Sequence, residues 1–526
     1  MKKFIINSLA GLMLLGAATS CGDNWLTLSD PNRESTETFW KTPEQFDQGL
    51  SAAYAQWRRP GMFSRWFHVL MILRSDEGWS ESPDPKFIAY ANFIISPYNT
   101  ENTEGIVNPW RETFNQIYYV NQVIDNVNDH GYDVLTKEEA DKALGQAYFI
   151  RGVAYWFIAG TYGKCPRQVS SVADGEIIEQ EEIYKQALSD FTEAAKLLPA
   201  EWPTAEKGRP TVGSAVGMQA RINMQLAGYC KRPTVNRPDE AKAYWQAAKE
   251  NIEAIFAMGR YSLVPNWLDN FTEANENNSE SLFEINFKDG LTNGQETGMH
   301  RPKFFGLYIS SGEGAWNDGS SRDWLLDEFD LERDKDGKPD MRKYYTLFYE
   351  NPDDNMKYYG KTYAEWNASE HFAHKCYWRK YTSVDTDNKA EDYSSGTNFR
   401  VLRLADVYLM YAEVLNELGG DRATAVEYIN KVRRRVNMRD LSVGQFPDYE
   451  SLKDQIRHER LVELCGESTR WYDLDRWGDI HTQEGVNKLA ERDPDFLNFK
   501  VGINHLYIIP NHDLSLFQGF TQNYGY

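Results

Sequence analysis

The chain has 526 residues, of which 14% are aromatic, and 78 Asp and Glu against 57 Lys and Arg give it a net charge of −21. This surplus of negative charge argues against nucleic acids and anionic lipid headgroups as partners, because both are polyanions. The length allows one large domain, or a few merged ones, with an ample core.

The first 20 residues have the pattern of a secretory signal peptide. Two lysines precede an apolar run over residues 4–18, which is too short to serve as a permanent membrane span. Cys21 follows a boundary of small residues and resembles the lipidated cysteine of a bacterial lipobox, with Ala18 in place of the usual leucine. We therefore predict a lipid anchor, palmitate included, on Cys21 and a flexible tether over residues 21–41. The alternative is an ordinary cleaved signal peptide with a chance cysteine.

Helical patterns dominate much of the remaining chain. The first helix is expected to begin at Thr42-Pro43, since Thr42 can cap it and Gln45 completes a capping box. Apolar residues at helical spacing predict further helices over about 109–129, 137–160, 211–228 and 402–418.

A small-large-small apolar spacing recurs and matches the second helix of a tetratricopeptide repeat. It occurs as Ala187, Phe191, Ala194, as Ala248, Ile252, Ile255, and as Ala425, Ile429, Val432. A single helix pair of this kind cannot bury its apolar face, so such pairs stack. The sequence therefore predicts a mostly α-helical repeat scaffold over about residues 42–60, 109–260 and 402–480.

Two segments, residues 62–108 and 262–400, interrupt the helical pattern. They are rich in Gly, Asn, Asp, Ser and aromatic residues, with brief strand-like runs such as residues 282–287. Between residues 304 and 381, 18 of 78 positions are aromatic. A loop-rich insertion in a helical scaffold is a common place for a binding surface, so we expect the ligand face here.

A series of motifs runs in order along the mature chain. The segments are FWKTPEQF at 39–46, AYFIRG at 147–152, YGKCP at 162–166, GRPT at 208–211, NSESLFEI at 278–285, RLADVYLMYAE at 403–413, INKVR at 429–433, RWYDLDRWG at 470–478 and QNYGY at 522–526. Together they resemble the SusD/RagB family of outer-membrane lipoproteins from Bacteroidetes. Tyr524 departs from the family pattern, in which proline is usual.

The resemblance implies a single SusD-like domain over residues 42–526, with a tetratricopeptide-like scaffold and a loop-rich ligand face. It also implies a non-enzymatic function, in which the protein binds extracellular glycan and passes it to a TonB-dependent transporter of the SusC type. The expected location is the outer surface of the outer membrane. Binding of peptides or another nutrient on the same lid-on-transporter architecture is the alternative, and a pure interaction scaffold is a third possibility.

Candidate ligand contacts come from the two loop-rich segments, from which the family draws its contacts. A sugar ring stacks on an aromatic plane, and its hydroxyl groups need polar donors and acceptors. Ordinary packing remains the alternative for each aromatic residue. The predicted ligand-binding residues are Arg74, Asp76, Trp79, Tyr90, Asn92, Tyr308, Trp316 and Asn317.

No catalytic or cofactor motif stands out, and neither an enzyme nor a cofactor is expected. Glu332, Asp334, Asp336 and Asp340 have partial calcium-loop spacing, but Lys343 stands where the bidentate glutamate is needed. A solvated turn is favoured there over a calcium site, which stays possible.

Two further groups of side chains, one charged and one of cysteines, are expected to serve the fold. The charged residues Glu459, Arg460, Glu463, Arg470, Asp473, Asp475 and Arg476 are expected to form ion pairs between packed helices. Cys165, Cys230, Cys376 and Cys465 lack metal-ligand spacing and are expected to be buried free thiols.

Overall fold

The computed structural model describes residues 39–95, 104–172, 175–288, 315–351, 356–382 and 395–526, and the backbone of 291–292 and 295–296. The predicted signal peptide, the lipidated Cys21, most of the tether and Tyr308 lie outside the described residues.

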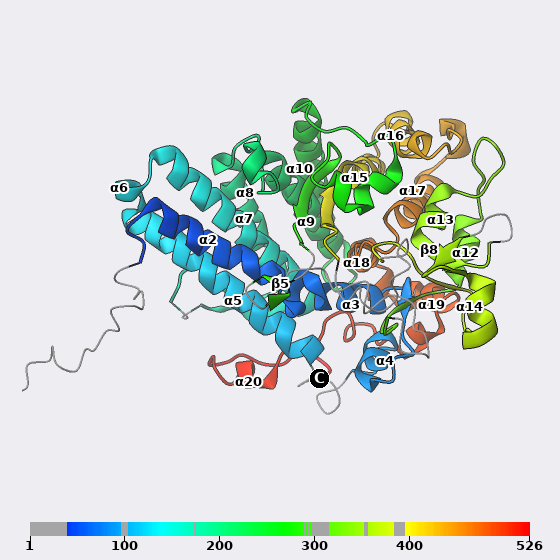
Figure 1. Ribbon diagram of the computed structural model, residues 1–526, viewed down its shortest axis with the longest axis horizontal. Coiled ribbons are helices and arrows are strands. Elements are labelled where there is room, and N and C mark those ends of the chain that lie inside the picture. The colour runs from blue at the N-terminus through cyan, green and yellow to red at the C-terminus, as the bar shows by residue number, and fades with distance from the viewer. Residues whose placement is uncertain are drawn as a thin grey trace, which may run out of the picture.

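The protein is mostly α-helical, as predicted, and its long helices stack one on the next (Figure 1). In the order α2, α5, α7, α8, α9, α10 and α15, each helix packs against the next. The last of them, α15, also packs on α16 and α17. These helices are α2 (Pro43–Trp57), α5 (Glu104–Asn126), α7 (Lys137–Thr161), α8 (Gln180–Leu197), α9 (Val212–Lys231), α10 (Pro238–Ala257), α15 (Leu404–Glu417), α16 (Arg422–Arg435), α17 (Tyr449–Leu464) and α18 (Arg470–Trp477).

Most predicted helices are present at nearly the predicted residues. The predicted capping box is present at the start of α2, where Gln45 Oε1 accepts from the Thr42 backbone N–H at 3.2 Å. The helix α5 begins at Glu104, five residues earlier than predicted, because Ile106 is fully buried and anchors the first turn in the core. Tertiary packing rather than local propensity holds this turn.

The prediction of loop-like structure for residues 62–108 is wrong in part. The segment contains α3 (Trp66–Leu73) and α4 (Pro85–Ala91). Every residue of α3 is buried, so its sequence is apolar on all sides and has no helical periodicity to detect.

The described strands form short antiparallel ribbons, of which β1–β7 and β4–β12 join segments that are distant in sequence. The strand-like run near residue 282 is confirmed as β4, and its partner lies beyond residue 398. The pairs are β1 (Gly78–Trp79) with β7 (Ser320–Ser321), β2 (Lys164–Pro166) with β3 (Ile177–Glu179), β4 (Ser281–Ile285) with β12 (Phe399–Arg403), β5 (Leu291–Thr292) with β6 (Gln295–Glu296), β8 (Leu347–Tyr349) with β11 (Cys376–Trp378), and β9 (Lys357–Tyr358) with β10 (Lys361–Thr362).

The aromatic-rich insertion contributes to the hydrophobic core that the scaffold helices form. Its short helices are α12 (Trp324–Phe329), which packs on α13 and α17, α13 (Met341–Thr346), which packs on β8, and α14 (Tyr363–Glu370), which packs on β10. Phe348 contacts Tyr358 and Tyr363, and Trp366 is buried beside them. The high aromatic content of this segment therefore serves packing in large part, which corrects the interpretation of the segment as chiefly a ligand face.

The charged C-terminal helices form buried ion pairs, as predicted. Arg460 donates to Asp473 at 2.8 and 2.9 Å and to Asp406 at 2.8 Å, and Arg476 donates to Glu413 at 2.7 and 2.8 Å. Burial alone would raise the pKa of Asp406, but Arg460 and Arg221 hold it down at about 2. The four cysteines are buried and free, as predicted.

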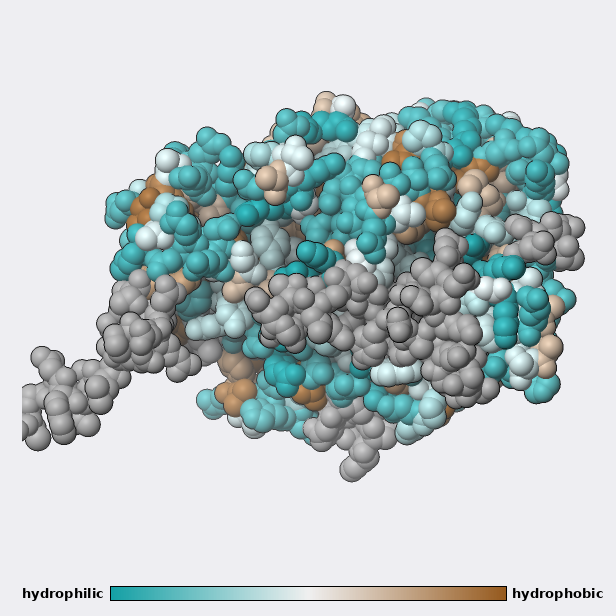
Figure 2. Space-filling model, in the orientation of Figure 1, coloured by the Kyte–Doolittle hydropathy of each residue, from teal (hydrophilic) through white to brown (hydrophobic). Residues whose placement is uncertain are grey.

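The outer surface is largely polar where Figure 2 shows it, with hydrophobic residues in small separate groups. Within the described residues, no helix is both long and apolar enough to cross a bilayer.

The other short α-helices of the described residues are α6 (Tyr132–Val134), α19 (Gln483–Ala490) and α20 (Asn511–Leu514).

Candidate ligand-binding site

The β1–β7 ribbon brings the two predicted ligand segments together. Trp79 pairs with Ser320 and Gly78 with Ser321, although more than 240 residues separate them in sequence. The Trp79 indole N–H donates to the Ser321 carbonyl at 2.9 Å, which ties the ribbon from the side. Residues just outside β7 therefore lie beside the loop that leads from β1 to α4.

Trp316 lies four residues before β7 and is the most exposed of the predicted contacts that the structure describes. Its side chain is 42% exposed, against 6% for Trp79. Asn317 follows it with a left-handed φ of 49°, a conformation that asparagine tolerates better than most residues. An aromatic ring of this exposure meets solvent, where a sugar ring could stack on it.

Polar residues directly follow Trp316 in the sequence. The Asp318 carboxylate accepts from the Ser82 hydroxyl at 2.7 Å, which links β7 to the loop after β1. The second Asp318 oxygen, Asn317 Oδ1 and Ser320 Oγ are buried without a hydrogen-bond partner among the described residues. Asn317, Asp318 and Ser320 are only 9%, 5% and 0% exposed, so these atoms lie beneath the surface that carries Trp316.

The pKa of Asp318 is raised to about 6, because burial disfavours its charged form more than Ser82 and Arg65 favour it. Because folding raises the pKa of Asp318, the folded state still holds a proton at pH values where the unfolded state has lost it. The Asp318 contribution to stability therefore falls as pH rises from about 4 to about 6.

Asp318→Asn is expected to be more stable than the parent at pH 7.5 and about equal to it at pH 4. The difference should be on the order of 1–3 kcal/mol, because asparagine keeps the Ser82 hydrogen bond without a buried charge. Urea denaturation of both chains at the two pH values measures it. A difference that does not change with pH would show that Asp318 is not the titrating group.

Trp79 is largely enclosed. Its ring lies 3.7 Å from the His374 ring, centroid to centroid, at 38°. His374 in turn pairs with Glu81 at 3.3 Å and Asp323 at 3.5 Å. The ring of Trp79 therefore supports the ribbon and leaves Trp316 as the exposed aromatic of the pair.

Arg74, Asp76 and Tyr90 lie in the interior, which corrects their prediction as ligand contacts. Arg74 is 1% exposed, and its guanidinium lies 4.1 Å from the Trp471 ring centroid. Asp76 is fully buried and accepts two hydrogen bonds from Arg470, at 2.8 and 2.9 Å. Although burial opposes it, Arg470 and Arg492 hold the pKa of Asp76 well below its ordinary value. A side chain closed off in this way cannot contact a ligand that arrives from solvent.

Tyr90 is fully buried against Trp66 and Tyr507. Asn92, by contrast, is half-buried at the end of α4, where its side-chain oxygen accepts from the Ile94 N–H at 3.1 Å. Asn92 and Asn317 stay candidates together with Trp316, and Tyr308 is not among the described residues.

Sequence reasoning missed Asp318 and Ser82. Asp318 directly follows the chosen Trp316-Asn317 pair, so its position was the available signal. Nothing in the sequence marks Ser82, because its link to Asp318 spans 236 residues.

Metal ligands do not assemble in the described parts of the chain. No group of three or more His, Cys, Asp or Glu residues there is placed to hold a metal ion. In the calcium-like loop, Asp334 accepts from the Asp336 and Lys338 N–H groups, and Asp340 binds Arg342. These carboxylates are therefore engaged with the protein around the turn at Gly337, whose φ is 78°.

Comparisons with known proteins find related sequences and structures. A family model described as "SusD family" matches residues 257–526, and one described as "Starch-binding associating with outer membrane" matches residues 68–224. A SusD-like protein of Formosa agariphila is 27% identical over 408 residues, which cover 71% of this chain and 70% of the relative.

Solved structures match over nearly the whole fold. A SusD superfamily protein from Bacteroides vulgatus has a TM-score of 0.77 at 24% identity, covering 93% of this chain and 100% of that one. Surface glycan-binding protein A from Bacteroides thetaiotaomicron, in complex with laminarihexaose, has a TM-score of 0.71 at 18% identity, covering 92% and 99%.

Proposed function

The chain belongs to the SusD family, and from this premise we propose that it is a non-enzymatic glycan-binding lipoprotein of the outer-membrane surface. In this proposal it captures oligosaccharides or polysaccharides and delivers them to a TonB-dependent transporter of the SusC type. Lipid on Cys21 anchors it, and residues 22–41 tether the folded body to the membrane.

The observation that carries the proposal is the exposed ring of Trp316, next to the β1–β7 ribbon that joins the two predicted ligand segments. A flat aromatic surface suits the apolar face of a sugar ring. One solved relative is a surface glycan-binding protein in complex with laminarihexaose, and one matching family is described as starch-binding. Both support the same ligand class.

An array of oligosaccharides and peptides, probed with residues 22–526, tests the ligand class. Binding to oligosaccharides of at least one class, and to none of the peptides, is the expected result. Binding to peptides alone would favour the alternative nutrient and overturn the glycan proposal.

Cys21→Ala is expected to leave a folded protein that no longer partitions with outer membranes. The reason is that Cys21 lies at the far end of the tether, outside the helical body that begins at α2. Fractionation of washed membranes, with an antibody against the folded body, measures the partition. Full retention of the variant in the membranes would contradict the lipid anchor.

A further inference from the structure

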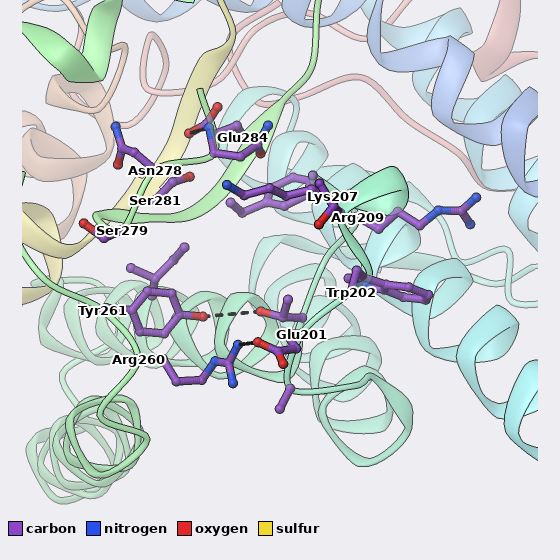
Figure 3. A pocket seen from close by; sticks show the side chains of 17 residues that line it. Glu201, Trp202, Lys207, Arg209, Arg260, Tyr261, Asn278, Ser279, Ser281 and Glu284 are labelled. Atoms are coloured by element: carbon purple, nitrogen blue, oxygen red, sulfur yellow. Dashed lines mark hydrogen bonds and ion pairs between the residues drawn. The ribbon is translucent and has the colours of Figure 1, made fainter. Parts of the chain in front are cut away.

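Two clefts lie on either side of the Lys207-Gly208 turn, in the loop that joins α8 to α9. The first, of about 420 Å³, opens between this loop and the segment that leads into β4 (Figure 3). The second, of about 310 Å³, is bounded by the C-terminal half of α2, including Tyr54 and Arg58. Both volumes lie in the range usual for small-molecule sites.

The first cleft has aromatic residues on opposite sides. Figure 3 shows Tyr261 on one side and Trp202 on the other, with Asn278 and Ser279 above Tyr261. The Trp202 indole N–H donates to the Pro210 carbonyl at 2.7 Å, which fixes the ring on the loop. The cleft thus combines two half-buried aromatic rings with neutral polar groups, a combination that suits a sugar ring.

Asn286, which directly follows β4, contacts the turn that carries Lys207. Gly208 has a φ of 103°, and a Cβ on it would lie 2.5 Å from the Asn286 amide nitrogen. That amide donates to the Gly208 carbonyl at 3.3 Å. Only glycine fits this close approach, so the position of Lys207 is built into the fold.

Most charges in the two clefts are neutralised by the protein. Arg209 pairs with Asp47 at 2.9 Å, and Arg260 pairs with Glu201. Glu284 is 1% exposed, pairs with Arg400 at 3.0 Å and accepts from Asn398 at 2.9 Å. Glu206 in the second cleft shares Arg209 with Asp47, at 3.4 Å, so these groups together leave one negative charge.

Lys207 and Arg58 differ from these groups, because no ion pair neutralises them in the part of the chain that the structure describes. Lys207 is exposed and extends into the first cleft (Figure 3). It also lines the second cleft, together with the half-buried Arg58. In a chain with a net charge of −21, two such cations on the walls of adjoining clefts mark a local site for an anion.

We propose that the Lys207 clefts form a second carbohydrate site, which takes a sugar unit that carries a negative charge. The anionic group pairs with Lys207, which lines both clefts, and the ring lies between Trp202 and Tyr261 in the first cleft. Arg58, in the second cleft, adds positive charge on the other side of the turn. The charge is that of a carboxylate, as in a hexuronic acid, or of a sulfate ester. This site shares no lining residue with the Trp316 site, so it goes beyond the proposed function.

The test is isothermal titration of residues 22–526 with digalacturonic acid, galactose 6-sulfate and neutral galactobiose. Lys207→Gln is expected to bind the acidic probes at least 5-fold more weakly than the parent. The remaining binding should lose most of its salt dependence between 0.1 and 0.5 M. The melting temperature of the variant should equal that of the parent. The matched control Lys488→Gln, an exposed lysine on α19, should bind like the parent. A preference between the first two probes tells carboxylate from sulfate.

A Trp316→Ala variant separates this site from the proposed one, because it should keep acidic-probe binding at the Lys207 clefts. Binding of neutral galactobiose as tight as that of the acidic probes would overturn the proposal. Equal affinities of the two lysine variants, or no binding of either acidic probe by the parent, would overturn it as well.

Discussion

Glu463→Gln is expected to lower the free energy of unfolding by about 3–5 kcal/mol, the largest loss among the variants discussed, because it removes one partner from a buried ionic network. Glu463 is fully buried on α17 and accepts from Arg403 at 2.6 Å, from Arg342 at 3.0 Å and from Arg435. Glutamine keeps the shape but leaves these arginines short of one negative charge.

The matched control is Glu427→Gln on α16, where Glu427 pairs with Arg434 at 2.7 Å on the surface. An exposed pair of this kind contributes less than about 1 kcal/mol. Urea denaturation of both variants and the parent gives the comparison. Equal losses in the two variants would show that burial does not set the value of these ion pairs.

The ionic network around Glu463 also predicts how the stability of the protein changes at acidic pH. Burial would raise the pKa of Glu463, but Arg435, Arg403 and Arg342 together hold it well below its ordinary value of 4.5. A lowered pKa means that the stabilisation is present above about pH 4.5 and is lost as pH falls. The parent should therefore lose more stability in acid than Glu463→Gln does.

Trp316→Ala is expected to weaken glycan binding by about 1–3 kcal/mol, or roughly 5-fold to 150-fold, since it removes the exposed stacking surface. Its melting temperature should stay close to that of the parent, because a side chain that is 42% exposed contributes little to the core. Titration with the best oligosaccharide from the array measures the loss.

Tyr118→Ala on α5 is the control, since Tyr118 is 47% exposed and lies on the helical scaffold. It should bind like the parent. If Trp316→Ala binds like the parent too, the ligand site lies elsewhere, and if it melts far below the parent, Trp316 serves the fold.

The helical scaffold was predictable because amphipathic helices such as α2 and α5 carry their burial pattern in the sequence. The helix α3 was not, because it is buried on every side. Burial pattern within one helix is a local signal, and the burial of α3 depends on helices that are distant in sequence.

The ligand face was harder to predict for the same reason. Arg74 and Asp76 have the composition of a sugar-binding loop, but Arg470, 394 residues further on, encloses Asp76. Trp79 and Trp316 both stand among small polar residues, and only the fold places His374 on one of them. Composition identified the two segments that meet at β1 and β7, while the exposure of each side chain depended on its tertiary neighbours.

The most direct test of the central claim is to titrate residues 22–526 with the best oligosaccharide from the array and then to recover the ligand for mass spectrometry. We predict saturable binding and an oligosaccharide of unchanged length, since a glycan-binding protein of this kind captures its ligand without cleaving it. Absence of binding heat across the oligosaccharides, or shortened products that accumulate with time, would contradict it.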